Sequence, residues 1–233
     1  MMQKELNSLC NYFSKGEKIL WVTSVILIVT SFLIFDRANY LVLTASLTGA
    51  TSLIFNAKGN PAGQVLMVVF SLLYGAVSYT FAYYGEMVTY LGMTAPMSVF
   101  ALVSWIKNPH NGNKSEVEIA SINCRQSIFM VILSAVVTYV FYYILAFFNT
   151  ANLLPSTVSV TTSFLAVYLT YKRSAFFAIA YASNDIILVV LWTLAAMSDI
   201  SYLPVVTCFV VFFINDTYTF INWTRIYKRQ KAV

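Results

Sequence analysis

The feature that most constrains the fold of this chain is a series of long apolar segments. We place eight of them, at residues 18–35, 39–56, 62–84, 86–106, 126–148, 155–171, 174–197 and 200–223. A helix needs about 20 mostly apolar residues to cross the hydrocarbon core of a bilayer. Only 10% of the residues are charged, whereas soluble domains carry about 25%. The sequence therefore predicts an all-α, polytopic membrane protein of about eight helices.

The basic residues predict the orientation of these helices. Thirteen of the 14 lysines and arginines fall at the N-terminus, in alternate connections and at the C-terminus, while Arg37 alone lies on the opposite side. Basic residues are enriched in cytoplasmic loops, so we expect both termini in the cytoplasm. The net charge of +5 follows this membrane pattern, and we expect no nucleic acid partner.

Residue types that carry catalysis or metal binding are scarce. The one histidine, His110, lies in a predicted loop, and Cys10, Cys124 and Cys208 show no metal-ligand spacing. No phosphate-binding GxxxxGK[ST] motif is present. We therefore expect no catalytic residue, no metal and no cofactor, and an enzyme is disfavoured.

The two halves of the chain resemble each other at a constant offset. Tyr74 corresponds to Trp192 and Trp105 to Trp223, both at an offset of 118. Equivalent helices are four crossings apart, so the two units run in the same direction, as in transporters built from parallel repeats. Trp105 and Trp223 each precede a basic residue by two positions, which is typical of interface anchors.

This duplication divides the chain into five parts. They are an N-terminal segment with an extra helix (1–38), a three-helix repeat (39–106), a cytoplasmic loop with a linker helix (107–154), a second three-helix repeat (155–225) and a basic cytoplasmic tail (226–233).

Polar side chains inside the apolar segments form the candidate site. They lie on single faces of three predicted helices, with two aspartates at the edges of those faces: Gln64, Tyr74, Tyr181, Asn184, Asp185, Trp192, Asn215, Asp216, Tyr218 and Asn222. An aspartate at the centre of a membrane helix costs about 2.5–3.5 kcal/mol, and such residues usually face a bundle interior or a water-filled cavity. Amides and aromatic rings suit an aromatic, hydroxyl-bearing small molecule.

A second interpretation keeps the same residues without a substrate. Asparagines within a membrane also hold helices together, at about 0.6 kcal/mol each. Under that interpretation the chain is a non-transporting membrane receptor or scaffold.

Four motifs follow one another over nearly the whole chain: "GATSLIFNAKGNPAGQVLMVVFSLLYG", "YYGEM", "NDIILVVLW" and "INDTYTFINW". In these motifs and their order the chain resembles the PnuC family of vitamin transporters. Two features depart from the family pattern: Asp216 stands where a small or neutral residue is usual, and "FFAIAYAS", containing Tyr181, replaces tryptophans before Asn184.

The resemblance implies a 3+1+3 helical bundle similar to the SWEET sugar transporters, with an extra N-terminal helix. It implies facilitated diffusion of nicotinamide riboside across a bacterial inner membrane, followed by trapping of the product by a cytoplasmic kinase that needs no physical contact with the transporter. Thiamine or riboflavin is the alternative cargo, and a homotrimer would be in keeping with the family. By motif, the substrate would be lined by Asn184, Trp192, Asn215, Tyr218 and Asn222, with Gln64 and Tyr74.

Overall fold

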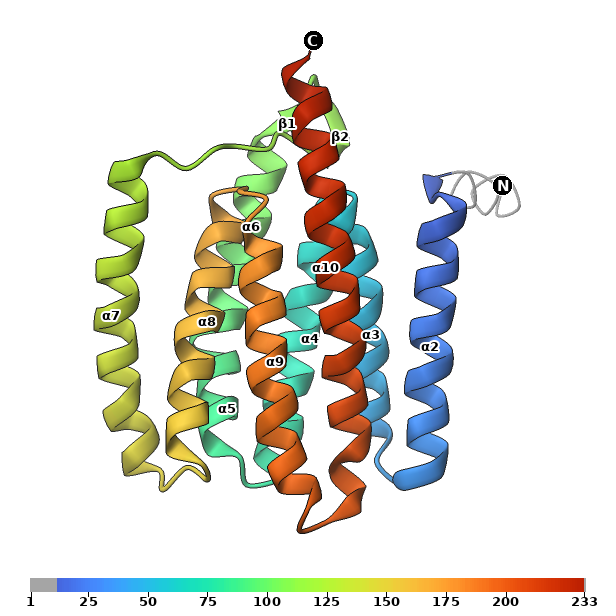
Figure 1. Cartoon of the computed structure of the whole chain (residues 1–233), viewed down its shortest axis with the longest axis vertical. Coiled ribbons are helices and arrows are strands. Elements are labelled where there is room, and N and C mark those ends of the chain that lie inside the picture. Colours follow the sequence, from blue (N-terminus) through green and yellow to red (C-terminus); the bar gives the residue numbers. More distant parts are fainter. Residues whose placement is uncertain (1–11, 233) are drawn as a thin grey trace.

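The described part of the protein is a bundle of long helices that run side by side (Figure 1). The computed structural model describes residues 12–232, so the predicted N-terminal segment before residue 12 lies outside the described residues. The elements are α2 (Lys15–Phe35), α3 (Tyr40–Ala57), α4 (Pro61–Thr80), α5 (Tyr84–Thr89), the π-helical η1 (Tyr90–Thr94), α6 (Ala95–Lys107), β1 (Pro109–His110), β2 (Asn113–Val117), α7 (Cys124–Phe147), α8 (Leu153–Tyr171), α9 (Phe177–Ala196), the 3₁₀ turn η2 (Ile200–Tyr202) and α10 (Leu203–Lys231). Within residues 12–232, eight helical segments are long and apolar enough to cross a membrane, counting α5, η1 and α6 as one. The predicted number of spans is confirmed.

Local sequence signals set where several helices begin. Ser14 and Glu17 form a capping box at the start of α2, and Asn123 and Gln126 form another at the start of α7. Each pairs a side-chain oxygen with a backbone N–H that the first helical turn leaves unbonded. Asn60 caps α4 just before Pro61, a residue suited to the first helical position.

The two predicted repeats are arranged around each other as a pair. The first unit comprises α3, α4 and α5–η1–α6, and the second comprises α8, α9 and α10. The third helix of each unit packs against the first helix of the other, α10 on α3 and α6 on α8. Helix α7 joins the units and packs along α8. The 3+1+3 architecture with an extra N-terminal helix is confirmed.

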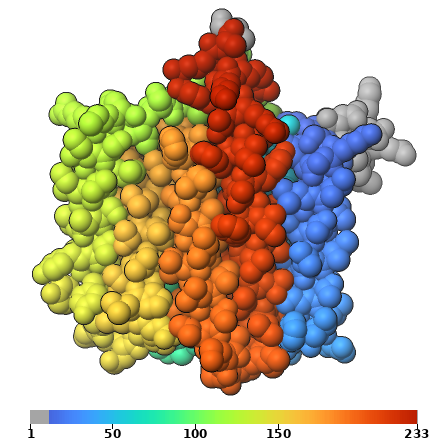
Figure 2. All heavy atoms as spheres, in the orientation of Figure 1, coloured from blue at the N-terminus to red at the C-terminus, as the bar shows by residue number. Residues whose placement is uncertain are grey.

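The extra helix α2 docks on the outside of this arrangement through polar contacts. Figure 2 shows α2 alongside α10 over most of its length. Ser31 shares a hydrogen bond of 2.9 Å with Thr207, and Trp21 donates one of 3.2 Å to Thr51 of α3. Between helices in lipid, hydrogen bonds and close packing replace the hydrophobic driving force that acts in water.

The connection between the repeats contains structure that the sequence analysis did not predict. β1 and β2 form a short antiparallel hairpin, with Asn111 and Gly112 at φ of 47° and 78° in its turn. The hairpin packs onto both units: the Val117 N–H donates to the Gly59 carbonyl at 2.9 Å, and Gln230 of α10 donates to the Val117 carbonyl at 3.0 Å. Residues of the predicted C-terminal tail continue α10 as helix to Lys231.

Candidate functional site

Two carboxyl groups meet in the middle of the bundle. Asp185 of α9 and Asp216 of α10 are 3% and 1% exposed, and their side chains lie against each other. Each also has a buried oxygen without a hydrogen-bond partner, Oδ2 of Asp185 and Oδ1 of Asp216. Two carboxylates in contact repel unless they share a proton or a cation approaches them. The structure thus brings together the two aspartates that the sequence placed on separate helices.

A third buried carboxyl group, Glu86 of α5, was not among the predicted site residues. Glu86 is 0% exposed, and neither of its carboxyl oxygens has a partner within hydrogen-bond distance and angle. The Glu86 side chain lies near Ser159 of α8. Tyr90 lies within range of electrostatic interaction with both Glu86 and Asp185. The sequence did hold a signal, since Glu86 belongs to the "YYGEM" motif and lies at the start of the predicted helix 86–106.

Tyr90 begins the only π-helical segment among the described residues, η1. The corresponding helix of the second unit, α10, has no such segment within its bounds. A π-helical turn inserts a residue into an α-helix and occurs frequently at functional sites. Here it places Tyr90 against Tyr74, with ring centroids 4.3 Å apart.

An aromatic cluster lies between the carboxyl groups and the end of the bundle opposite the hairpin. The Trp192 indole N–H donates a 2.7 Å hydrogen bond to the Tyr74 hydroxyl. The Trp192 ring lies 4.6 Å from Tyr83 and 5.8 Å from Tyr202 between centroids. The two predicted residues Tyr74 and Trp192, one from each repeat, are therefore in direct contact.

A second aromatic cluster lies at the hairpin end. Trp105 and Trp223 are 5.3 Å apart between ring centroids, and Phe177 is 4.7 Å from Trp223. Both indoles are 0% exposed and donate to backbone carbonyls, Trp105 to Thr170 and Trp223 to Asn56. The prediction that they are interface anchors is wrong: the basic residues that follow them reach the surface, while the rings turn inward and pack together.

These two contacts locate the axis that relates the repeats. Tyr74 and Trp192 are equivalent positions of the two units, and so are Trp105 and Trp223. Equivalent residues can touch each other only where they lie at the axis. The axis therefore passes through both aromatic clusters, and Asp185 and Asp216 lie in the bundle between them.

The predicted amide residues bond mainly to neighbouring helices. Asn184 Oδ1 accepts hydrogen bonds from three hydroxyls of α8, those of Ser159, Thr162 and Ser163, at 3.3, 2.8 and 3.0 Å. Gln64 donates to Asn56 at 2.8 Å and keeps a buried Oε1 without a partner.

Three predicted residues of α10 turn away from the two aspartates. Asn215 donates to Ser24 of α2 at 3.0 Å, and its Oδ1 is buried without a partner. The Tyr218 hydroxyl donates to Glu17 of α2 at 3.2 Å, and Asn222 donates to the Ala57 carbonyl at 2.8 Å. The structure therefore does not bring these three together with Asp185 and Asp216.

Tyr181 of α9 lies one helical turn from Asp185, toward the hairpin end. The Tyr181 ring centroid is 6.2 Å from that of Phe177. Tyr181 also lies within range of electrostatic interaction with Asp216. Tyr181 thus connects the carboxyl pair with the aromatic cluster at the hairpin end. Over residues 12–232 no group of three or more histidine, cysteine, aspartate or glutamate side chains has a metal-binding arrangement.

Comparison with known proteins gives three related findings. The family model described as nicotinamide mononucleotide transporter matches residues 39–225. A nicotinamide riboside transporter, PnuC, of Neisseria mucosa is 27% identical over 219 residues, which cover 91% of this chain and 82% of that protein. The crystal structure of the vitamin B3 transporter PnuC superposes with a TM-score of 0.81 at 25% identity, covering 94% of both chains.

Proposed function

This chain belongs to the nicotinamide mononucleotide transporter family, and we propose that it carries nicotinamide riboside by facilitated diffusion. It is a multi-pass membrane transporter, as its relatives are, and not an enzyme. The observation that carries the proposed substrate is the buried pair Asp185–Asp216 between two aromatic clusters.

The chemistry of this pair favours a cationic substrate. Nicotinamide riboside contains a positively charged pyridinium ring, and a carboxyl pair with unpartnered buried oxygens gains most from a cation. Aromatic faces such as those of Tyr74, Tyr90 and Trp192 attract flat cations. The Gln64 amide has a free buried oxygen for ribose hydroxyls or the carboxamide.

The two aromatic clusters support an alternating-access mechanism. Each cluster blocks the path along the axis at one end. Tyr74–Trp192 lies on one side of the aspartates and Trp105–Trp223 on the other. Rocking of one three-helix unit against the other would open one cluster at a time, as in other repeat-built transporters.

We propose that no ion gradient drives the transport and that a cytoplasmic kinase traps the transported substrate by phosphorylating it. Uniport of a cation equalises its electrochemical potential, so in the absence of a membrane potential it only equalises the substrate concentration on the two sides. Phosphorylation adds about −1.5 to −2 charges, which conflict with the two aspartates and with a low-dielectric path.

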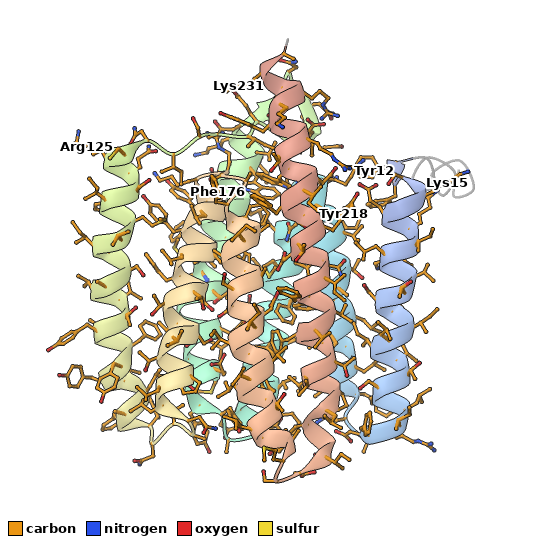
Figure 3. The ribbon with its side chains drawn as sticks, viewed as in Figure 1. Tyr12, Lys15, Arg125, Phe176, Tyr218 and Lys231 are labelled. Carbon is orange, nitrogen blue, oxygen red and sulfur yellow. The ribbon has the colours of Figure 1, made fainter. Side chains whose placement is uncertain are left out.

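The proposed orientation places both termini in the cytoplasm of a bacterial inner membrane. Figure 3 shows Lys15, Arg125 and Lys231 at the same end of the bundle, which supports this orientation. A homotrimer also remains a proposal, for which α7 offers a nearly uncovered face, with Ser134 and Leu145 as its buried residues.

Thiamine is the second candidate cargo. It is also a flat aromatic cation, so the same carboxyl pair would take its charge, and Asp216 is a departure from the family pattern. Riboflavin is neutral at pH 7 and gives the two aspartates no such partner.

Uptake into liposomes tests the proposal. Purified protein in liposomes with an imposed proton gradient, and with the membrane potential held at zero, should take up labelled nicotinamide riboside only until the inside and outside concentrations are equal, and an uncoupler should leave the rate unchanged. Excess thiamine should compete weakly. Loss of uptake on adding the uncoupler would refute uniport, and uptake of labelled thiamine in place of nicotinamide riboside would refute the cargo.

A further inference from the structure

A cavity of about 630 Å³ lies at the hairpin end of the bundle, away from the axis. Ligand sites commonly measure about 300–1,000 Å³. Its walls include Ile119 and Ile122 of the linker, Met130 of α7, Phe176 beside the α8–α9 turn, and Phe220 and Lys228 of α10. None of these residues belongs to the candidate substrate site.

The cavity exists because α7 packs on one side only. Helix α7 contacts α8 and α5, and the linker that follows β2 spans the remaining distance from α10 to the start of α7 (Figure 1). The Ala120 N–H donates to the Arg173 carbonyl at 3.0 Å, and Gln230 accepts from the Ile119 N–H at 2.9 Å, which holds the linker over the gap. Figure 3 shows Phe176 under this linker.

Positive charge surrounds the mouth of the cavity. Lys228 is part of its wall, and the Lys231 ammonium lies 5.1 Å above the ring of Tyr227, another wall residue. Arg173 is adjacent in sequence to the wall residue Ser174, and Arg125 lies two residues before the wall residue Ser127. The nearby acidic residues are Glu118, and Glu116, which is paired with Arg229. The cavity therefore has an apolar wall and a basic rim at its mouth.

We propose that this cavity binds an anionic phospholipid, with its acyl chain against the apolar wall and its phosphate at Lys228. Basic pockets between membrane helices on the cytoplasmic side bind anionic lipid head groups. The cavity lies at the end of the bundle where the basic residues gather, which is the level of the lipid head groups in the proposed orientation. A small soluble anion would satisfy the basic rim but leave the isoleucine and phenylalanine wall uncovered, so it fits this site less well.

Native mass spectrometry of the full chain with defined lipids tests this site. Phosphatidylglycerol and phosphatidylcholine with identical acyl chains are added to the detergent-purified protein. Phosphatidylglycerol should be retained more strongly. Lys228→Gln should lower its retention about fivefold, the effect of one basic residue near an anionic surface. Lys18→Gln is the matched control, because it removes an exposed lysine at the same end of the bundle, on α2.

A second variant separates the cavity from general surface charge. Ala175→Trp places a large side chain into the cavity wall and should lower the retention of both lipids, while Lys228→Gln should affect only the anionic one. Equal retention of the two lipids by the unmodified protein would overturn the proposal. So would equal losses in Lys228→Gln and Lys18→Gln, or displacement of phosphatidylglycerol by inorganic phosphate alone. Because the readout is lipid retention, a failure of the proposed substrate leaves this result unaffected.

Discussion

At the scale of single residues, the two Asn–Asp pairs behave alike. Within each pair the aspartate contacts the other aspartate, and the asparagine bonds to a different helix, Asn184 to α8 and Asn215 to α2. Neighbouring residues of a helix point about 100° apart, so adjacent polar residues serve different interfaces. The sequence predicted that these four side chains are buried, but not which helix each one faces, because that depends on the packing of all eight helices.

Trp192 and Trp105, which are equally buried, allow a matched test of which tryptophan contributes to substrate affinity. Trp192 and Trp105 are both 0% exposed, so replacing either with alanine costs similar packing, about 3–5 kcal/mol. Trp192 belongs to the proposed binding site, and stacking on an aromatic ring is worth about 1–3 kcal/mol per base. We expect Trp192→Ala to weaken nicotinamide riboside binding more than Trp105→Ala, measured by titration on the folded, monodisperse fraction. Equal losses of affinity would argue against Trp192 as a substrate contact.

At the scale of elements, helix positions follow from the sequence more closely than the connections do. Apolar length fixed the eight spans, since a bilayer of constant thickness demands about the same run from each. The β1–β2 hairpin was missed although Asn111–Gly112 is the pair most typical of a tight hairpin turn. The end of α10 was missed because its basic residues suggested a solvated tail, whereas Gln230 bonds to the hairpin and keeps the last turns helical.

The close approach of α3 and α4 depends on a glycine. A Cβ added at Gly63 would lie 2.7 Å from the backbone nitrogen of Asn56 and 2.2 Å from its Oδ1, an atom that accepts a hydrogen bond from Gln64. We expect Gly63→Ala to destabilise the protein by about 1–3 kcal/mol, the usual cost of overpacking, seen as a lower thermal transition in detergent. Gly92→Ala, where nothing lies within 4 Å, should keep the transition or raise it slightly, because alanine favours a helix more than glycine does. Equal transitions for the two variants would show that α3 and α4 can separate at no cost.

At the scale of the whole molecule, the repeat offset of 118 residues predicted the architecture, whereas the position of the axis comes from the contacts in the structure. The pairs Tyr74–Trp192 and Trp105–Trp223 were recognised as equivalent positions, and their contact could not be foreseen from either repeat alone. The prediction that all the polar residues converge at one place holds for the aspartates, which meet, but not for Tyr218 and Asn222, which bond to α2 and α3. The extra helix α2 explains part of this difference, since it takes up polar groups that would otherwise face lipid.

In the proposed mechanism, the carboxyl pair between the two aromatic clusters recognises the positive charge of the substrate. Calorimetric titration of the unmodified protein and of the Asp185→Asn/Asp216→Asn double variant with nicotinamide riboside and with its uncharged dihydro form tests this most directly. The double variant should lose about tenfold or more in affinity for the cation, since a hydrogen bond to a charged group contributes about 1.5–3 kcal/mol, and should bind the uncharged form as the unmodified protein does. Undiminished affinity of the double variant for the cation would contradict the claim.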